Sequence, residues 1–207
     1  MGSLSREPDS GLIITNHSTL ALPAVDIRGE SLTLDSDGNG YVGAIHAIDT
    51  NSWSGPILLH RDARLALSGI DARLTLSGPI QGSSGLVVED RGTLRLEGSQ
   101  PNTFTGVLVC NGGVTELFKP TALAISSDIQ VNIGALRLLA SHQILDAASL
   151  SLDLLGRFEM NAFSEVIGDL TGLGKSTWAA VCSRLLAAAR WMYSTETSVA
   201  QVGNSTS

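Results

Sequence analysis

The chain has 207 residues and a formal net charge of −7, and aromatic residues make up only 4% of it, whereas glycine occurs 22 times. Few aromatic residues and many glycines are typical of short strands joined by tight turns. The acidic balance and the scattered basic residues argue against a nucleic-acid partner or an anionic membrane surface, because both are bound by clustered lysines and arginines.

The first ten residues, 1–10, are predicted to be a disordered N-terminus. They lack the basic region and the apolar run of an export signal, so we expect the chain to start inside a larger protein. A membrane span is not predicted in this chain, because the longest apolar stretch, which begins near Trp178, is interrupted by Arg184 and Arg190.

Between residues 11 and 174 a short apolar unit, Leu-x-Leu, recurs beside glycine. It occurs at Leu20/Leu22, Leu32/Leu34, Leu65/Leu67, Leu74/Leu76, Leu94/Leu96, Leu136/Leu138 and Leu150/Leu152. Because alternate residues of a strand point to opposite faces, each unit offers one thin apolar edge that cannot form a core alone. Stacking of these units predicts an all-β fold, a right-handed parallel β-helix (β-solenoid), over residues 11–174.

The spacing of the expected strands, roughly 8 to 12 residues, also fits a β-sandwich. Self-similarity favours the solenoid instead. The segments 65–69, 74–78 and 94–98 repeat one pattern, in which Leu-x-Leu is followed by a polar residue and glycine. Such a repeat is typical of stacked coils.

The most regular stretch runs from Gly78 to Leu117 and contains four short elements. They read Gly82-Ser-Ser-Gly-Leu86, Gly92-Thr-Leu-Arg-Leu96, Asn102-Thr-Phe-Thr-Gly106 and Gly113-Val-Thr-Glu-Leu117. In this order the elements resemble the autotransporter-associated β-strand repeat, also called the passenger-associated transport repeat. The flanking segments 51–57 and 161–168 are similar to other parts of the family pattern, so the resemblance covers about residues 41–174.

Ten residues of these elements are predicted to have structural roles in the repeat: Gly85, Leu86, Gly92, Leu94, Leu96, Asn102, Phe104, Gly106, Gly113 and Leu117. The glycines allow turns with positive φ at low cost. Asn102 is expected to bond to the backbone of its own turn, and Phe104, like Trp53, to supply a large inward or stacking group. The motif therefore predicts structure and no activity.

The resemblance implies a passenger segment that a C-terminal barrel, absent from this chain, would export through an outer membrane. Its implied location is the cell surface or the extracellular space. Its implied role is scaffold, adhesion or surface display, with an aid to vectorial export and folding. The implied partners are adjacent coils of a larger parent chain, surface glycans, or the surfaces of host or neighbouring cells.

Residues 175–207 differ abruptly from the repeat region, because glycine nearly disappears and alanine, leucine and arginine form a helix-favouring run. They are predicted to be a short helical or disordered tail. One explanation is a capping helix over the open end of the solenoid. We favour a frameshift near Gly174, because shifted codons can encode a continuation of the repeat. The tail would then be non-native, and the nucleotide sequence of the gene tests this hypothesis.

No catalytic, cofactor-binding or metal-binding site is predicted. The segment 172–177 resembles the end of a phosphate-binding loop, but Asp169 stands where that loop needs its first glycine. The segment 35–40 has the oxygen spacing of the first half of a calcium loop, but its twelfth position is His46 instead of glutamate. We expect an acidic surface turn there.

Histidines and cysteines are too dispersed to define a site. No zinc-binding pattern or thiol pair is expected from these residues, which are His17, His46, His60, His142, Cys110 and Cys182. The two cysteines lie far apart and match no metal spacing, so unpaired thiols are predicted.

A carbohydrate-active β-helix enzyme is the alternative function. Its carboxylates would come from residues such as Asp62, Asp71, Glu89 and Asp90, but the sequence marks no pair among them. This alternative requires acidic and basic side chains gathered on one lateral face of the stack. A third alternative is a non-functional pseudogene fragment, against which detection of the peptide in cells would argue.

Overall fold

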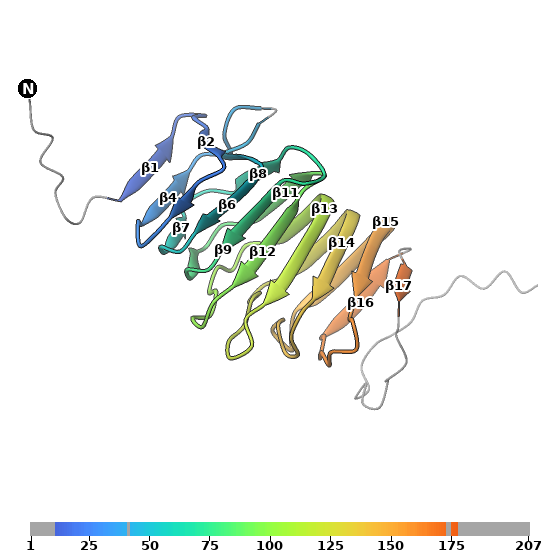
Figure 1. The fold of residues 1–207 in the computed structure, drawn as a ribbon. Helices are drawn as coiled ribbons and strands as arrows, with labels where there is room; N and C mark the ends of the chain where they lie inside the picture. Colours follow the sequence, from blue (N-terminus) through green and yellow to red (C-terminus); the bar gives the residue numbers. More distant parts are fainter. Residues whose placement is uncertain (1–10, 41, 173–174, 178–207) are drawn as a thin grey trace, which may run out of the picture.

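The structure is a computed structural model that describes residues 11–40, 42–172 and 175–177, the last three as backbone. Its named strands pair in parallel with strands of neighbouring coils, and one coil is a complete circuit of the chain around three faces (Figure 1). About seven coils stack, and the described residues contain no helix. The prediction of an all-β parallel solenoid is confirmed. The β-sandwich alternative is wrong, because it needs antiparallel sheets.

Each coil contributes a strand or part of a long strand to the three faces. The first face contains β1 (Leu12–Thr15), β4 (Leu32–Asp35), β7 (Ile57–Leu59) and β10 (Ile80–Gly82). The second face contains β2 (Leu20–Pro23), β5 (Ile45–Ile48), β8 (Ala63–Leu67), β11 (Leu86–Asp90), the first halves of β13 (Leu108–Phe118), β14 (Ile129–Leu138) and β15 (Ser149–Glu159), and β16 (Asp169–Gly172). The third face contains β3 (Asp26–Ile27), β6 (Thr50–Trp53), β9 (Arg73–Leu76), β12 (Thr93–Glu97), the second halves of β13, β14 and β15, and β17 (Lys175–Thr177).

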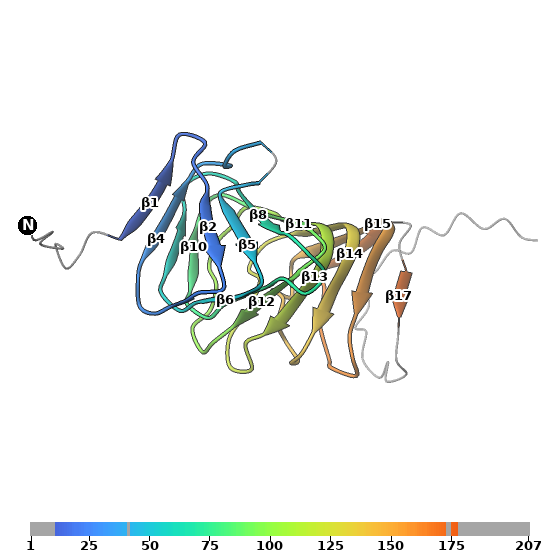
Figure 2. The ribbon, with the colours of Figure 1, turned by 45° about the horizontal axis from the view of Figure 1, so that its top comes forward.

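The three longest strands, β13, β14 and β15, lie side by side and connect the second face to the third (Figure 2). On the first face, backbone hydrogen bonds continue the stack after β10. Thr103 donates its N–H to the carbonyl oxygen of Ile80 at 2.8 Å, and Thr105 donates to Gly82 at 3.0 Å. The stacking is therefore continuous on all three sides.

The core is a set of columns of inward side chains, one residue from each coil. Leu94 pairs in register with Leu74 and Thr115, and all three side chains are fully buried. The Leu-x-Leu units occupy such columns, as the alternation of strand side chains predicts. Trp53 and Phe104 add large groups to the core, with exposed fractions of 2% and 0%. Of the two placements expected from the sequence, inward and stacking, the inward one is confirmed.

The corner between the second and third faces turns through residues with positive φ. In successive coils these are Asp49, Gly69, Asp90, Gly113 and Gly134, with φ between 51° and 115°. At Gly113 (φ 51°) a Cβ would also collide with the carbonyl oxygen of Gly92 in the preceding coil. Glycine is required there for both its conformation and its size.

Parallel pairing continues slightly beyond the repeat region that the sequence predicts. β17 pairs with the end of β15, so regular structure reaches Thr177, which lies past the expected end at residue 174. The rest of the predicted tail, 178–207, and the predicted disordered N-terminus, 1–10, lie outside the described residues. Among the residues that are described, no helix has the length and apolar character needed to cross a membrane.

Candidate functional site

The predicted repeat residues line the core and the contacts between coils. Five of them have side chains that are at most 1% exposed: Leu86, Leu94, Leu96, Phe104 and Leu117. The four predicted glycines, Gly85, Gly92, Gly106 and Gly113, lie where a Cβ would press against an adjacent coil. Only Gly113 among these four glycines has a positive φ. The other three are needed because neighbouring backbones approach closely, which the expectation of turn conformations did not include.

Asn102 bridges three coils, which corrects the expectation that it bonds to its own turn. The side chain is 1% exposed. Its Oδ1 accepts the N–H of Ile80 at 2.9 Å, and its Nδ2 donates to the carbonyl oxygen of Ala124 at 2.8 Å. Successive coils lie about 4.8 Å apart, so an amide directed along the stack meets backbone groups on both sides. Asn102 is therefore a clamp between coils.

Gln143 forms a second buried clamp. Its Oε1 accepts the backbone N–H of Lys119 at 2.6 Å, and its Nε2 donates to the carbonyl oxygen of Lys119 at 3.0 Å. The Lys119 side chain is buried as well, and its Nζ donates to the carbonyl oxygen of Gln100 at 2.8 Å. Burial lowers the pKa of this ammonium group to about 8, although Glu97 opposes the shift. These contacts hold the coils together where the third face ends.

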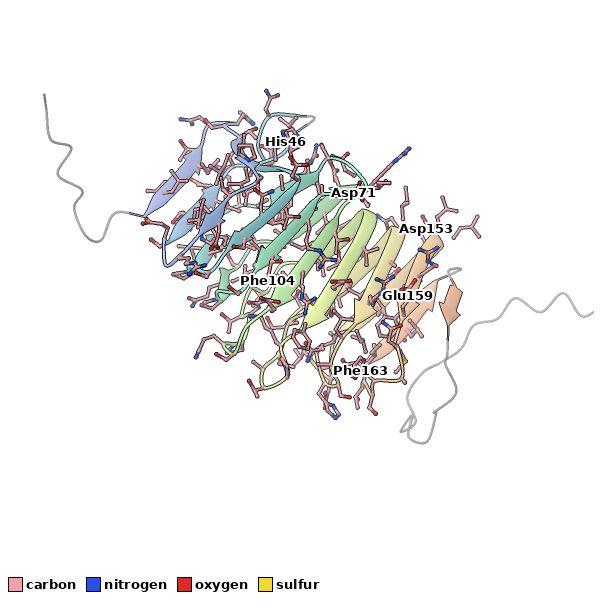
Figure 3. The ribbon with its side chains drawn as sticks, in the orientation of Figure 1. His46, Asp71, Phe104, Asp153, Glu159 and Phe163 are labelled. Carbon is pink, nitrogen blue, oxygen red and sulfur yellow. The ribbon has the colours of Figure 1, made fainter. Side chains whose placement is uncertain are left out.

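A row of charged side chains crosses the third face. It contains Arg73, Arg95, Glu97, Glu116, Arg137, Arg157 and Glu159, which we call the charge ladder. In its central column, Arg95 pairs in register with Glu116, Glu116 with Arg137, and Arg137 with Glu159. Opposite charges thus alternate from one coil to the next, and Figure 3 marks Glu159 at the last position of the column.

Glu116 lies at the centre of the charge ladder, and its side chain is only 9% exposed. Its carboxylate lies 3.0 Å from a guanidinium nitrogen of Arg73 and 3.4 Å from one of Arg137. The Nε of Arg137 donates to Glu159 at 2.7 Å, and this hydrogen bond raises the pKa of the Arg137 guanidinium further. The carboxylate of Glu116 is therefore neutralised by arginines of other coils.

The sequence carries a signal for this ladder that a search for local motifs does not find. Arg95, Glu116, Arg137 and Glu159 recur at intervals of 21 or 22 residues with alternating sign. This interval is the length of one coil in that part of the chain. The pattern becomes visible only once the coil length is known.

An apolar groove of about 680 Å³ lies beyond the carboxyl ends of β13 and β14. Its walls include Phe118, Pro120, Leu123, Leu139, His142 and Phe163. The guanidinium of Arg95 lies 4.7 Å above the ring of Phe118, which joins the groove to the charge ladder. Phe163 lies in the loop after β15 (Figure 3). The groove has few polar groups with which to orient a ligand.

The gathering of acids and bases on the third face meets the first requirement of the alternative enzyme. Glycoside hydrolysis also needs a carboxyl group that holds a proton to give to the leaving group. The ladder carboxylates instead accept hydrogen bonds from guanidinium groups, as at Glu116 and Glu159. The arrangement suits a stack of fixed charges better than proton transfer.

The other carboxylates considered in the sequence lie apart from the ladder and mostly join coils. Asp62 accepts the N–H of Gly85 at 2.6 Å, and Asp90 accepts the hydroxyl of Ser68 at 2.9 Å. Glu89 lies 3.5 Å from Arg64, and Asp71, which Figure 3 labels, is exposed in the turn between β8 and β9. The structure does not bring these four carboxylates into one site.

The acidic turn over residues 35–40 contacts one histidine and one arginine of other segments. His17 lies 3.0 Å from Asp37, and Asp35 pairs with Arg61 at 3.2 Å. Within the described part of the chain, no three histidine, cysteine, aspartate or glutamate residues gather as metal ligands. The last two residues before β17, which belong to the segment that resembles a phosphate-binding loop, lie outside the described residues.

Cys110 is a free thiol in a core column of the second face. It is fully buried, and burial raises its pKa to about 11, although a hydrogen bond from the thiol to Thr115 partly opposes the shift. The thiol is therefore protonated and unreactive at neutral pH. The prediction of an unpaired thiol is confirmed for Cys110, and Cys182 lies outside the described residues.

Replacement of Glu116 tests the charge ladder. We expect Glu116→Gln to lower the free energy of unfolding by about 1–2 kcal/mol, because the guanidinium groups around it are partly exposed and screened. The loss should shrink at about 1 M NaCl, where the Debye length falls to about 3 Å. Urea denaturation at low and high salt measures both effects, and Asp71→Asn on an exposed residue serves as the control. Equal losses in the two variants would contradict the role of the ladder.

Glu165 gives the fold a dependence on pH. Its carboxylate accepts the N–H of Gln143 at 2.6 Å and that of Val166 at 3.3 Å. Burial raises its pKa from 4.5 to about 7, against the opposing effect of these hydrogen bonds. The folded chain therefore binds this proton more tightly than the unfolded chain does. The stabilisation from protonated Glu165 is complete below pH 4.5 and is lost as the pH rises through about 7.

Replacement of Glu165 tests this pH dependence. We expect the urea midpoint of the wild-type chain to fall between pH 4.5 and about pH 7 more steeply than that of Glu165→Gln, which cannot titrate. The difference between the two curves isolates Glu165 from other titrating groups. Parallel curves over this range would show that Glu165 does not contribute.

Comparison with known proteins finds no matching family model, no matching curated protein and no matching solved structure. The class of this protein is therefore defined by its geometry. It is a parallel β-solenoid in which buried amide clamps and a surface charge ladder join one coil to the next.

Proposed function

We propose that this chain is a structural segment of an autotransporter-like passenger that serves as a scaffold for adhesion or surface display. The observation that carries the proposal is that the polar side chains of this chain form contacts along the stack, from one coil to the next. Buried Asn102 and Gln143, and the central pairs of the charge ladder, bond to residues of neighbouring coils. Such contacts stiffen the stack along its length, which is the property that a surface rod needs.

The resemblance to the autotransporter-associated repeat supports the same proposal. Its motif residues occupy core and contact positions that a solenoid requires. Phe104 fills the core, Asn102 clamps three coils, and Gly106 permits close approach of the adjacent backbone. A passenger repeat that works by stacking would use its motif residues in this way.

Vectorial export is compatible with this architecture. Each coil that emerges from a membrane channel can bury apolar side chains on the coil before it, and this burial opposes backward sliding. The partners proposed for the segment are further coils of a parent chain, surface glycans, and the surfaces of host or neighbouring cells. Its proposed location is the cell surface or the extracellular space.

The genomic DNA on either side of the gene tests the proposal. We expect an export signal upstream and an outer-membrane barrel downstream, in this reading frame or in shifted frames. The bases after the codon for Gly174 should also permit a continuation of the repeat in a shifted frame. Flanking DNA that encodes neither the signal nor the barrel would contradict the proposal.

A display experiment tests the role of the fold itself. The full chain would be placed between an export signal and an outer-membrane barrel, with an epitope at its N-terminus, and labelled on intact cells. We expect surface labelling, and a strong reduction for Leu94→Asp, which puts a charge into the core. Thr171→Asp, on an exposed residue, is the matched control. Equal labelling of all three chains would show that stacking does not assist export.

A further inference from the structure

A tight turn over residues 15–18 joins β1 to β2 in the first coil (Figure 2). The N–H of Ser18 donates to the carbonyl oxygen of Thr15 at 3.0 Å, and the two central residues, Asn16 and His17, have φ of 53° and 58°. Positive φ at both central positions is what a type I′ turn requires. Asn16 and Ser18 are both exposed. The turn therefore presents the side chains of both residues to solvent.

Residues 16–18 read Asn-His-Ser, which is the pattern Asn-x-Ser/Thr with a middle residue other than proline. Enzymes that attach sugars to asparagine recognise this pattern. The amide nitrogen of asparagine is a weak nucleophile, because its lone pair is delocalised into the carbonyl group, so the enzyme must bind the amide directly. The hydroxyl two positions later is the second group that it recognises. In a folded chain, an acceptor asparagine therefore needs both groups accessible.

Asn16 differs in this respect from the other asparagines that the structure describes. None of those six is followed two positions later by serine or threonine, and they are Asn39, Asn51, Asn102, Asn111, Asn132 and Asn161. Most of their amides are also engaged. Asn102 bonds to the coils on both sides, and Asn161 donates to the carbonyl oxygen of Leu138 at 3.2 Å. Asn16 alone among the described asparagines combines an exposed side chain with a serine two positions later.

The hydroxyl of Ser18 has no structural role in this turn. Turn chemistry explains an asparagine at residue 16, because asparagine adopts positive φ more readily than most residues. It does not require a hydroxyl at residue 18. The next hydroxyl along the chain, that of Thr19, donates to the carbonyl oxygen of Gly43 at 2.7 Å, whereas that of Ser18 has no hydrogen bond to any described residue. Both groups of the pattern are therefore available to an enzyme.

We propose that Asn16 is the acceptor of an N-linked sugar. This modification belongs to secreted and surface proteins, so its occurrence in cells rests on the proposed function. In the transfer, Nδ2 of Asn16 attacks C1 of a sugar that a phosphate group activates. The bond between C1 and the phosphate oxygen breaks, and the phosphate leaves with the electron pair. One proton of the amide passes to a base of the glycosyltransferase.

The full chain tests the proposal as an acceptor in two reactions. One contains a purified asparagine glycosyltransferase with UDP-glucose, and the other an oligosaccharyltransferase with a lipid-linked oligosaccharide. We expect peptide mapping by mass spectrometry to find a sugar on Asn16 in at least one reaction, and the added mass distinguishes the two donors. Asn204 also matches the pattern, so every chain carries Asn204→Gln. A peptide of residues 11–22 reports whether each enzyme accepts the sequence without the fold.

Asn16→Gln and Ser18→Ala should each remove the sugar, and Ser18→Thr should keep it, because threonine retains the hydroxyl. Asn39 is the matched control within the same chain. It is also exposed, but tyrosine stands two positions later, so it should stay unmodified. Circular dichroism should show strand content equal to that of the parent chain in every variant.

Two results would overturn the proposal. The first is transfer to the peptide but not to the folded chain, or transfer to neither, because the turn would then not be an acceptor. The second is an unchanged amount of sugar on the Ser18→Ala chain, because the hydroxyl would then have no role. These results do not depend on the flanking DNA or on surface display, so failure of the proposed function is detected separately.

Discussion

Phe104→Ala is expected to lower the free energy of unfolding by about 3–5 kcal/mol, the range typical of a large aromatic residue removed from a core. Phe104 is fully buried within the fifth coil. The residues on either side of it, Thr103 and Thr105, are bonded through their N–H groups to the preceding coil. The backbone is therefore fixed next to the cavity, and the coil cannot collapse to fill it. Urea denaturation followed by circular dichroism measures the loss.

Phe163→Ala is the matched control, because Phe163 is 36% exposed in the loop after β15. We expect this variant to lose less than about 1 kcal/mol. Stacked coils can unfold in parts, so amide hydrogen exchange at Ile80 and Thr105 should accompany the denaturation curves. A loss for Phe163→Ala as large as that for Phe104→Ala would show that burial in the stack does not govern stability.

Asn102→Leu is expected to destabilise the fold by about 2–5 kcal/mol, since it leaves a buried donor and a buried acceptor without partners. The donor is the N–H of Ile80, and the acceptor is the carbonyl oxygen of Ala124. Leucine is close to asparagine in size, so most of the loss would come from the missing hydrogen bonds. The same denaturation experiment measures it, and faster exchange of the Ile80 amide should accompany it.

Asn132→Leu provides the comparison for this clamp. Asn132 also joins neighbouring coils, through a 2.9 Å hydrogen bond to the side chain of Asn111, but it is partly exposed. Water can replace that bond, so we expect a loss below about 1 kcal/mol. If both variants lost the same free energy, the buried position of Asn102 would have no special importance.

The predictable parts of the fold are those that depend on the alternation of side chains between the two faces of a strand. Leu94 and Leu96 flank an outward residue, and strand geometry alone places both on one side. Their repetition beside glycine indicates that each unit needs a neighbour, which predicts stacking. The inward position of Phe104 follows from the same reasoning, because a large apolar group in such a thin coil has no other place to be buried.

The contacts of Asn102 and the charge ladder could not be predicted, because both depend on which residues lie side by side in different coils. The coils differ in length: residues 36–44 separate β4 from β5, whereas only residues 60–62 separate β7 from β8 in the next coil. Glu116 meets Arg95 and Arg137 only because the coils on either side of it have nearly equal lengths. A motif search over a short stretch of sequence cannot detect such pairs, because their residues lie about one coil length apart.

By itself, the sequence of this protein determined that its strands are short and numerous and that each needs neighbouring strands to bury its apolar side chains. The reason is that the alternation of side chains along a strand and the chemistry of turns depend on residues close together in the chain. The tertiary structure determined which residues of different coils lie side by side. Because of this arrangement, Asn102 bonds to the coils on both sides of its own, and Glu116 lies between arginines of other coils. Apolar residues such as Ile27 and Leu170 lie in the first and the last described coils and are only partly buried. The physical reason is that contacts along a solenoid follow the coil length, which results from the path of the whole chain.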